Sequence, residues 1–194
     1  MKLTLLISSI LIIGTVLFLT CCKGKKPEQT GTNKNAESKQ VKENPYIGLR
    51  QMALEATSEQ LGLTSLSDNE VYGVVMDWDL GNGIMTLITY QTGDASMYLS
   101  TGGGVIGGGQ HESVSNASKQ FVKMASNYFD NAENIDSIPL PDKECVQFYF
   151  LTTKGKYIIQ EKMTNIENKS SFLFDYFEEA NKVISELRIT TENR

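Results

Sequence analysis

Side chains that commonly carry enzyme chemistry are scarce in this chain. Its 194 residues include a single histidine, His111, and three cysteines. Cys21 and Cys22 are adjacent and Cys145 stands alone, so a folded domain has neither a CxxC pair nor an even set of cysteines for disulfides. One histidine also excludes the HExxH motif and any zinc site with two histidine ligands. We therefore expect no metal site.

Other signatures of catalysis are missing as well. The chain has neither the GxxxxGK(S/T) motif of a P-loop nor the GxSxG motif of a nucleophile elbow. Ser100, Ser113 or Ser115 could join His111 in a triad, but neighbours on one loop rarely reach the required geometry. Asp77-Trp78-Asp79 lacks the further ligands of a calcium loop. We assign no catalytic residue and no cofactor, and we favour a non-enzymatic function.

Positive charge is unevenly distributed along the chain. The formal net charge is -5, from 18 Lys and Arg against 23 Asp and Glu. Seven of the basic residues but only 3 of the acidic ones precede residue 45, so residues 45–194 carry 11 positive and 20 negative side chains, a net charge of -9. Such an acidic domain would repel phosphate backbones, and we expect no nucleic-acid partner. The lysines before residue 45 would instead be attracted to an anionic membrane surface.

The first 20 residues have the pattern of a secretory signal, because Lys2 precedes an uncharged, apolar run. The run ends in Leu17-Phe18-Leu19-Thr20-Cys21-Cys22, which resembles the lipobox of bacterial lipoprotein signal peptides. The resemblance implies a signal peptide over residues 1–21 and acyl chains such as palmitate on Cys22, with Cys21 as the alternative. An uncleaved single-span anchor is the other interpretation. Either one predicts a protein of the bacterial cell envelope, held at the membrane with its domain outside the cytoplasm.

Residues 22–44 are predicted to be a flexible polar tether, because apolar side chains are almost absent there. A chain of this length spans roughly 25 Å. The remaining residues, 45–194, have the usual size of one domain.

Hydrophobic periodicity predicts an α+β domain. The expected elements are a helix that begins at Asn44-Pro45 and ends near Gly62, strands at 71–78, 84–90 and 95–101, a helix at 114–129, strands at 145–152 and 157–163, and a helix at 173–187. We expect a five-stranded antiparallel sheet flanked by three helices, with the first and last helices on one face. The order helix, three strands, helix, two strands, helix is similar to profilin-like and roadblock-like topologies, a likeness that does not indicate a function.

The least ordinary stretch of the chain runs from Ser100 to Val114. Two glycine triplets enclose Val105-Ile106, and His111 follows. A strand, a glycine-rich loop and a helix often build an anion site from backbone N–H groups. The candidate ligand-binding residues are Gly102, Gly103, Gly104, Gly107, Gly108, Gly109, His111, Glu112 and Ser113. The other interpretation is a turn, or a place where two backbones touch. The stretch is also similar to a Gly-Gly-Gly, apolar pair, Gly-Gly-Gly, His-Glu signature of uncharacterised bacterial proteins, and that resemblance implies no activity.

Two functions remain open at this point. The first is a membrane-tethered, non-enzymatic binding or interaction domain, whose partners are the membrane, through the N-terminal lipid, and an unknown protein or small ligand. The second is a small-ligand or anion-binding domain, with or without hydrolytic activity, centred on Gly102–Ser113. Val105 and Ile106 could fill the core of the domain or insert into a partner, and we favour the core because exposed apolar surface is usually covered.

Overall fold

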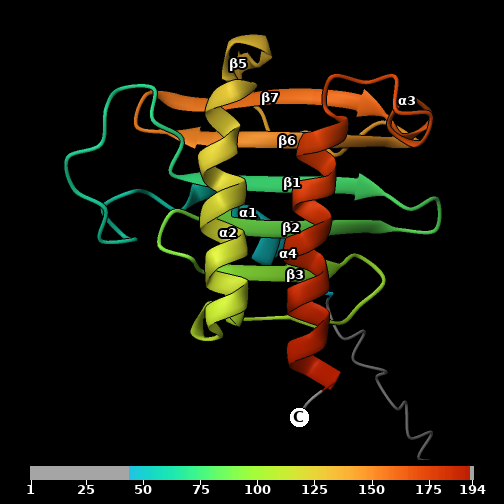
Figure 1. Ribbon diagram of the computed structural model, residues 1–194, viewed down its shortest axis with the longest axis horizontal. Helices are drawn as coiled ribbons and strands as arrows, with labels where there is room; N and C mark the ends of the chain where they lie inside the picture. Colours follow the sequence, from blue (N-terminus) through green and yellow to red (C-terminus); the bar gives the residue numbers. More distant parts are fainter. Residues whose placement is uncertain (1–43, 193–194) are drawn as a thin grey trace, which may run out of the picture. The chain divides into compact units, whose positions relative to one another are not determined.

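The computed structural model describes residues 44–192 (Figure 1). The predicted signal peptide, Cys21, Cys22 and the predicted tether up to residue 43 lie outside the described residues. The described chain has an α+β fold in which helices cross one antiparallel sheet.

The sheet has seven strands in the spatial order β4-β3-β2-β1-β6-β7-β5. Its strands are β1 (Gly73–Asp79), β2 (Ile84–Tyr90), β3 (Ala95–Leu99), β4 (Gly104–Val105), β5 (Glu133–Ile135), β6 (Cys145–Thr152) and β7 (Gly155–Lys162). The helices are α1 (Tyr46–Glu55), α2 (Glu112–Met124), α3 (Met163–Glu167) and α4 (Phe174–Glu192), with 3-10 turns η1 (Gly108–Gln110), η2 (Ala125–Asn127) and η3 (Phe129–Asn131).

Short turns join β1 to β2, β2 to β3, β3 to β4 and β6 to β7, and the two strands of each of these pairs are antiparallel neighbours in the sheet. Asn82-Gly83 correctly predicts the β1–β2 hairpin, in which Asp79 pairs with Ile84. The residue that adopts the left-handed conformation is Gly81, at φ +81°, and Leu80 N donates to Gly83 O. Hairpins therefore build both halves of the sheet, and the contact of β1 with β6 joins the halves.

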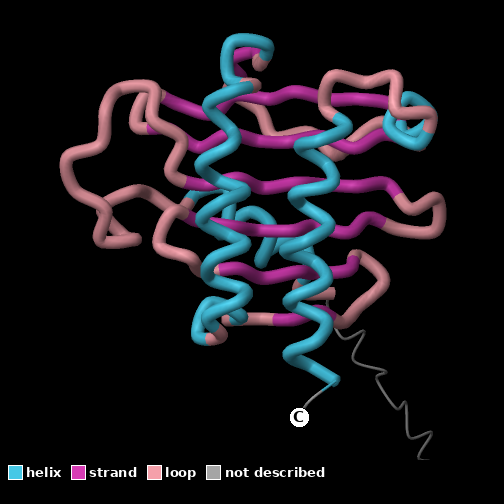
Figure 2. The backbone as a smooth tube through the Cα atoms, viewed as in Figure 1, coloured by secondary structure: helices cyan, strands magenta, loops and turns pink. Residues whose placement is uncertain are grey.

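Both faces of the sheet are covered, as Figures 1 and 2 show. Helices α2 and α4 lie side by side on one face, and α1 lies behind the strands on the other. Along β1, Val74 and Met76 pack under α2 and α4, whereas Val75 packs on the side of α1. Because each face buries side chains, the central strands have long apolar runs rather than a strict alternation.

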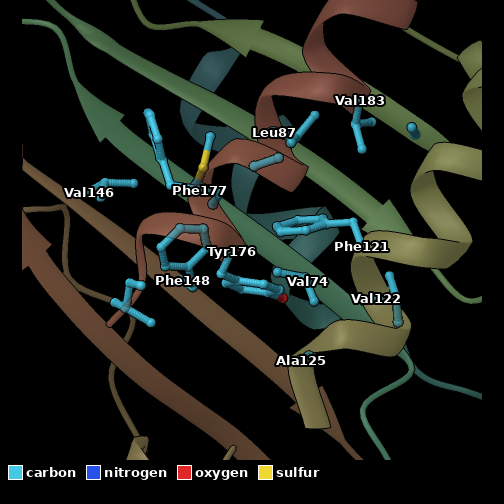
Figure 3. Packing of buried hydrophobic residues seen from close by; sticks show 14 of the residues in the cluster. Val74, Leu87, Phe121, Val122, Ala125, Val146, Phe148, Tyr176, Phe177 and Val183 are labelled. Carbon is cyan, nitrogen blue, oxygen red and sulfur yellow. The ribbon is translucent and has the colours of Figure 1, made fainter. Parts of the chain in front are cut away.

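A group of aromatic side chains lies among the aliphatic residues of the core beneath α2 and α4 (Figure 3). Phe121 of α2 stacks on Tyr176 of α4, with 4.6 Å between ring centroids. Tyr176 also contacts Phe148 of β6 at 4.9 Å. These contacts pack the layer formed by the two helices against the centre of the sheet.

The expected five-stranded sheet with three helices is wrong. The five expected strands are present, but β4 and β5 extend the sheet at its two edges, and the short α3 follows β7. Two- and three-residue strands carry no readable alternation, which is why the sequence pattern missed them. The topological likeness to profilin-like and roadblock-like folds is wrong with it, because it was drawn from the five-strand order.

The predicted placement and length of the first helix are also wrong. The terminal helices α1 and α4 lie on opposite faces of the sheet rather than on the same face. Helix α1 ends at Glu55 because Ala56 is extended, and Gly62, at φ +71°, ends a separate turn. Pro45 rather than Asn44 stands at the N-cap position of α1, although Asn44 Oδ1 accepts a hydrogen bond from Tyr46 N in the first turn.

The fully buried hydroxyl of Tyr176 has no hydrogen-bond partner within residues 44–192. An unsatisfied buried polar group costs free energy, so we expect Tyr176→Phe to raise the free energy of unfolding by about 1 kcal/mol. The matched control is Tyr90→Phe, which removes the hydrogen bond from Tyr90 Oη to Ala53 O and should lower it by a similar amount. Urea unfolding followed by circular dichroism measures both, and a loss of stability in Tyr176→Phe would contradict the assignment.

Candidate functional site

The glycine stretch forms one edge of the sheet and the turn that leads to α2. Gly104 pairs with Tyr98 and Val105 with Met97, which makes β4 the edge strand next to β3. Val105 is partly buried against the core under α2 and α4, whereas the Ile106 side chain is 66% exposed. The prediction that the apolar pair fills the core therefore holds for Val105 and is wrong for Ile106.

Local packing and backbone conformation account for the glycines of this stretch. Gly102, Gly103 and Gly107 have φ of +106°, +86° and +71°, where side chains with a Cβ are strained. The other three glycines sit at close approaches. A Cβ on Gly104 would lie 2.2 Å from Met97 O, on Gly108 2.3 Å from Leu187 Cδ2, and on Gly109 2.8 Å from Asp94 Cα. These positions need glycine whether or not a ligand binds.

The polar residues of the stretch stand at the start of α2. His111 occupies the N-cap position, is exposed, and makes no side-chain capping hydrogen bond. Glu112 and Ser113 are also exposed, and Ser113 lines a shallow cavity between α2 and α4. The nine candidate residues thus lie in one segment of the chain, in which Gly108 is buried, Gly109 is half-buried and the other seven are exposed.

A buried ion pair between Arg50 of α1 and Asp77 of β1 is the main polar feature that sequence analysis missed. Arg50 Nε and Nη2 lie 2.8 and 2.6 Å from Asp77 Oδ2, and the two side chains are 6% and 0% exposed. Arg50 also donates to the carbonyl oxygens of Ile138 at 3.2 Å and Pro139 at 2.7 Å. The guanidinium therefore links α1, the sheet and the segment that precedes β6.

Hydroxyl groups satisfy the second oxygen of the Asp77 carboxylate. Thr86 Oγ1 donates to Asp77 Oδ1 over 2.5 Å, and Tyr46 Oη lies 2.8 Å from Thr86 Oγ1. The threonine hydroxyl has one proton, which it gives to Asp77, so Tyr46 is the donor to Thr86. This chain of hydrogen bonds ties the first turn of α1 to β2.

Ionisation in this cluster is set by burial and by the ion pair. Burial lowers the pKa of Arg50, but the hydrogen bonds and charge of Asp77 outweigh it, and the net pKa is raised. Burial raises the pKa of Tyr149 to about 12, so its phenol stays protonated and donates to Pro139 O. The polar groups of the cluster are directed at one another, which suits a role in holding α1 on the sheet.

A surface cavity of about 410 Å³ borders this cluster at Gln147 and Pro139. Its other polar groups include Asp142 and Gln160, which already bond to each other, because Gln160 Nε2 donates to Asp142 Oδ2 and Asp142 N donates to Gln160 Oε1. Asp142 and Gln160 are thus already engaged with each other.

One feature of the sequence indicates the ion pair of Arg50 and Asp77. Asp77 directly follows the apolar run Val74-Val75-Met76, and a carboxylate in a buried strand needs a buried partner. The pattern Asp77-Trp78-Asp79 instead suggests a calcium loop, whose further ligands are missing. Within residues 44–192, no three His, Cys, Asp or Glu side chains lie close enough together to hold one metal ion. No helix of that described part is long and apolar enough to cross a membrane.

Comparisons with protein-family models, with curated proteins and with solved structures found no match to this chain.

Removal of one partner of the buried ion pair should destabilise the fold strongly. Arg50→Met leaves Asp77 as an unpaired buried charge, and we expect the free energy of unfolding to fall by about 3–5 kcal/mol. Adding Asp77→Leu removes that charge and should recover part of the loss. Denaturant unfolding of the single and double variants measures these changes in the free energy of unfolding. If Arg50→Met were as stable as the unaltered protein, the ion pair would not be what holds α1 on the sheet.

Substitutions in the glycine stretch should show which of its residues stabilise the fold by packing and which are exposed side chains with little effect on stability. Gly108→Ala pushes a Cβ toward the fully buried Leu187, and we expect a loss of about 1–3 kcal/mol. His111→Ala alters an exposed side chain and should change stability by less than about 0.5 kcal/mol. Thermal unfolding of both variants gives the comparison. The packing explanation fails if Gly108→Ala is as stable as His111→Ala.

Proposed function

We propose that this protein is a membrane-anchored, non-enzymatic binding domain, and that the outer face of α1 lies on the membrane surface. The observation that carries the proposal is the uncharged, apolar outer face of α1. Ile47 is 57% exposed and Met52 is 70% exposed. Gly48 and Gln51, which lie between them, add no charge.

Helix α1 carries large apolar side chains on its outer side as well as on its inner side, unlike an ordinary surface helix. Its inner side buries Tyr46, Ala53 and Leu54 against the sheet. The basic residue Arg50 is turned inward to Asp77, so the first exposed charge of the helix is Glu55, its last residue. A helix that is apolar all round is normally covered on every side. The exposed side of α1 therefore calls for a covering surface.

A lipid surface is the covering that the position of α1 favours. The predicted tether ends at residue 44, two residues before the start of α1, so the predicted anchor and tether lead directly into this helix. Asn44 Nδ2 donates to Ser100 O over 2.5 Å, which fixes this point of the chain to the end of β3. The lysines that precede Asn44 attract anionic lipid by about 1 kcal/mol each when close to the surface.

Charge also determines which face of the domain can approach an anionic membrane. Residues 45–194 carry a net charge of -9, so most of the domain surface is repelled by anionic lipid. The first two turns of α1 carry no exposed charge and escape that repulsion. Burial of Ile47 and Met52 at the interface adds hydrophobic stabilisation of a few kcal/mol in total, roughly 25 cal/mol per Å² of apolar surface.

The orientation can be tested with one dye placed on either face of the sheet. Gln51→Cys on α1 and Gln120→Cys on α2 are matched exposed positions, and the only other cysteine among the described residues, Cys145, is buried. We expect an environment-sensitive dye at position 51 of the mature protein, from which residues 1–21 are removed and in which Cys22 carries the lipid, to be quenched by spin-labelled lipid in phosphatidylglycerol nanodiscs. The same dye at position 120 should not be quenched.

The anchor is tested separately by mass spectrometry of the mature protein. A lipid-modified Cys22 with residues 1–21 removed agrees with the proposal, and an intact Met1 without lipid contradicts the anchor. Equal quenching at positions 51 and 120 in an anchored protein contradicts the placement of α1 alone.

A further inference from the structure

We infer that a groove beside the C-terminal half of α2 binds a small organic anion, formed by one carboxylate on a compact apolar body. The groove has a volume of about 450 Å³, within the usual range of small-ligand sites. It lies between α2, the residues that lead into β1, and Gln91 at the end of β2. This site goes beyond the proposed function and does not depend on α1 contacting lipid, because α1 and α2 lie on opposite faces of the sheet (Figure 1).

Hydrogen bonds hold the walls of the groove in place. Ser118 Oγ of α2 lies 3.3 Å from Tyr90 O and 3.1 Å from Asp94 O, which fixes the helix to the β2–β3 turn. Gln91 N donates to Tyr72 O over 2.8 Å, so the strand ends on the opposite wall are also joined. A groove that is already formed lowers the cost of ordering the protein when a ligand binds.

Two lysines give the groove its positive charge. Lys119 and Lys123 lie on successive turns of α2 and both line the groove. The ion pairs among residues 44–192 are Arg50–Asp77, Lys154–Asp68 and Lys182–Glu179, so neither of these two lysines is paired within that part of the chain. In a domain with a net charge of -9, two unpaired ammonium groups at one cavity are an unusual concentration of positive charge.

The side chain of Lys119 passes close to a glycine of the β2–β3 turn. A Cβ on Gly93 would lie 2.9 Å from Lys119 Cε, so glycine at position 93 leaves room for this side chain. Lys119 is exposed, and its ammonium is therefore open to a ligand in the groove.

One carboxylate, Glu70, also lines the groove, and it is already engaged. Glu70 accepts hydrogen bonds from Gln91 Nε2 at 2.9 Å and from Ser67 N at 3.1 Å. These bonds, with that from Gln91 the larger cause, lower the pKa of Glu70. The groove therefore carries two positive charges and one negative charge, which fits a ligand with a single negative charge.

The floor of the groove is apolar. Val71 and Val122 both line the groove and are both buried. Methylene groups of a ligand can contact these two side chains while its carboxylate reaches Lys119 and Lys123. The chemistry of the lining thus combines a charged rim with an apolar base, as in a site for a short-chain carboxylate.

Calorimetry with hexanoate and its neutral analogue hexanamide tests the site, using the full chain in uncharged detergent micelles. We expect hexanoate to bind and hexanamide to bind much more weakly. The double variant K119Q/K123Q should weaken hexanoate binding by about tenfold or more, since charge-assisted hydrogen bonds are lost. The matched control K154Q/K182Q removes two lysines elsewhere and should bind as the unaltered protein does.

Three results would overturn the inference. These are no binding of hexanoate, equal affinity for hexanoate and hexanamide, and unchanged affinity in K119Q/K123Q. Because the micelles carry no anionic lipid, none of these results bears on whether α1 lies on a membrane.

Discussion

The buried ion pair of Arg50 and Asp77 is the interaction on which the arrangement of this domain depends. Removing two charges from water is costly, and a buried pair is tolerated only when further hydrogen bonds satisfy both groups. Here Asp77 accepts from Arg50 and Thr86, and Arg50 also reaches two carbonyl groups before β6. The pair therefore places α1 on one defined part of the sheet and in one rotational setting.

That setting decides which side of α1 faces outward. With Arg50 directed inward, the outer face carries Ile47 and Met52 and no exposed charge until Glu55. The opposite face of the sheet is occupied by α2 and α4 over an aromatic core (Figure 3). The two sides of the sheet thus differ in character. One side presents an apolar helix where the predicted tether joins, and the other presents the lysine-lined groove of α2.

The long elements could be predicted from sequence because they carry regular patterns. The five longer strands follow apolar runs, and α2 and α4 follow clear helical spacing. The edge strands β4 and β5 could not be predicted, because two or three residues cannot show a period. The face of the sheet on which α1 lies was predicted wrongly, because helical periodicity marks the buried side of a helix but does not say which face of a sheet the helix covers. Arg50 also resembles a surface residue until Asp77 is placed beside it.

The candidate site was predictable only in part. Glycine density correctly marked a segment with special backbone demands, including the left-handed Gly107. The need for glycine at position 108 could not be seen, because it arises from Leu187, far away in the sequence. The groove beside α2 could not be predicted for the same reason, because Glu70, Gln91 and Lys119 are far apart in the sequence and come together only in the folded chain. The anchor, the tether and a ligand at the glycine stretch stay predictions.

The central claim is that α1, locked to the sheet by its buried arginine, presents its apolar face to lipid. Hydrogen–deuterium exchange of the full chain in anionic nanodiscs, compared with uncharged micelles, tests it most directly. The account predicts that amide exchange in α1 slows in the anionic bilayer while exchange in α2 is unchanged. Unchanged exchange in α1, or equal slowing in α1 and α2, would contradict it.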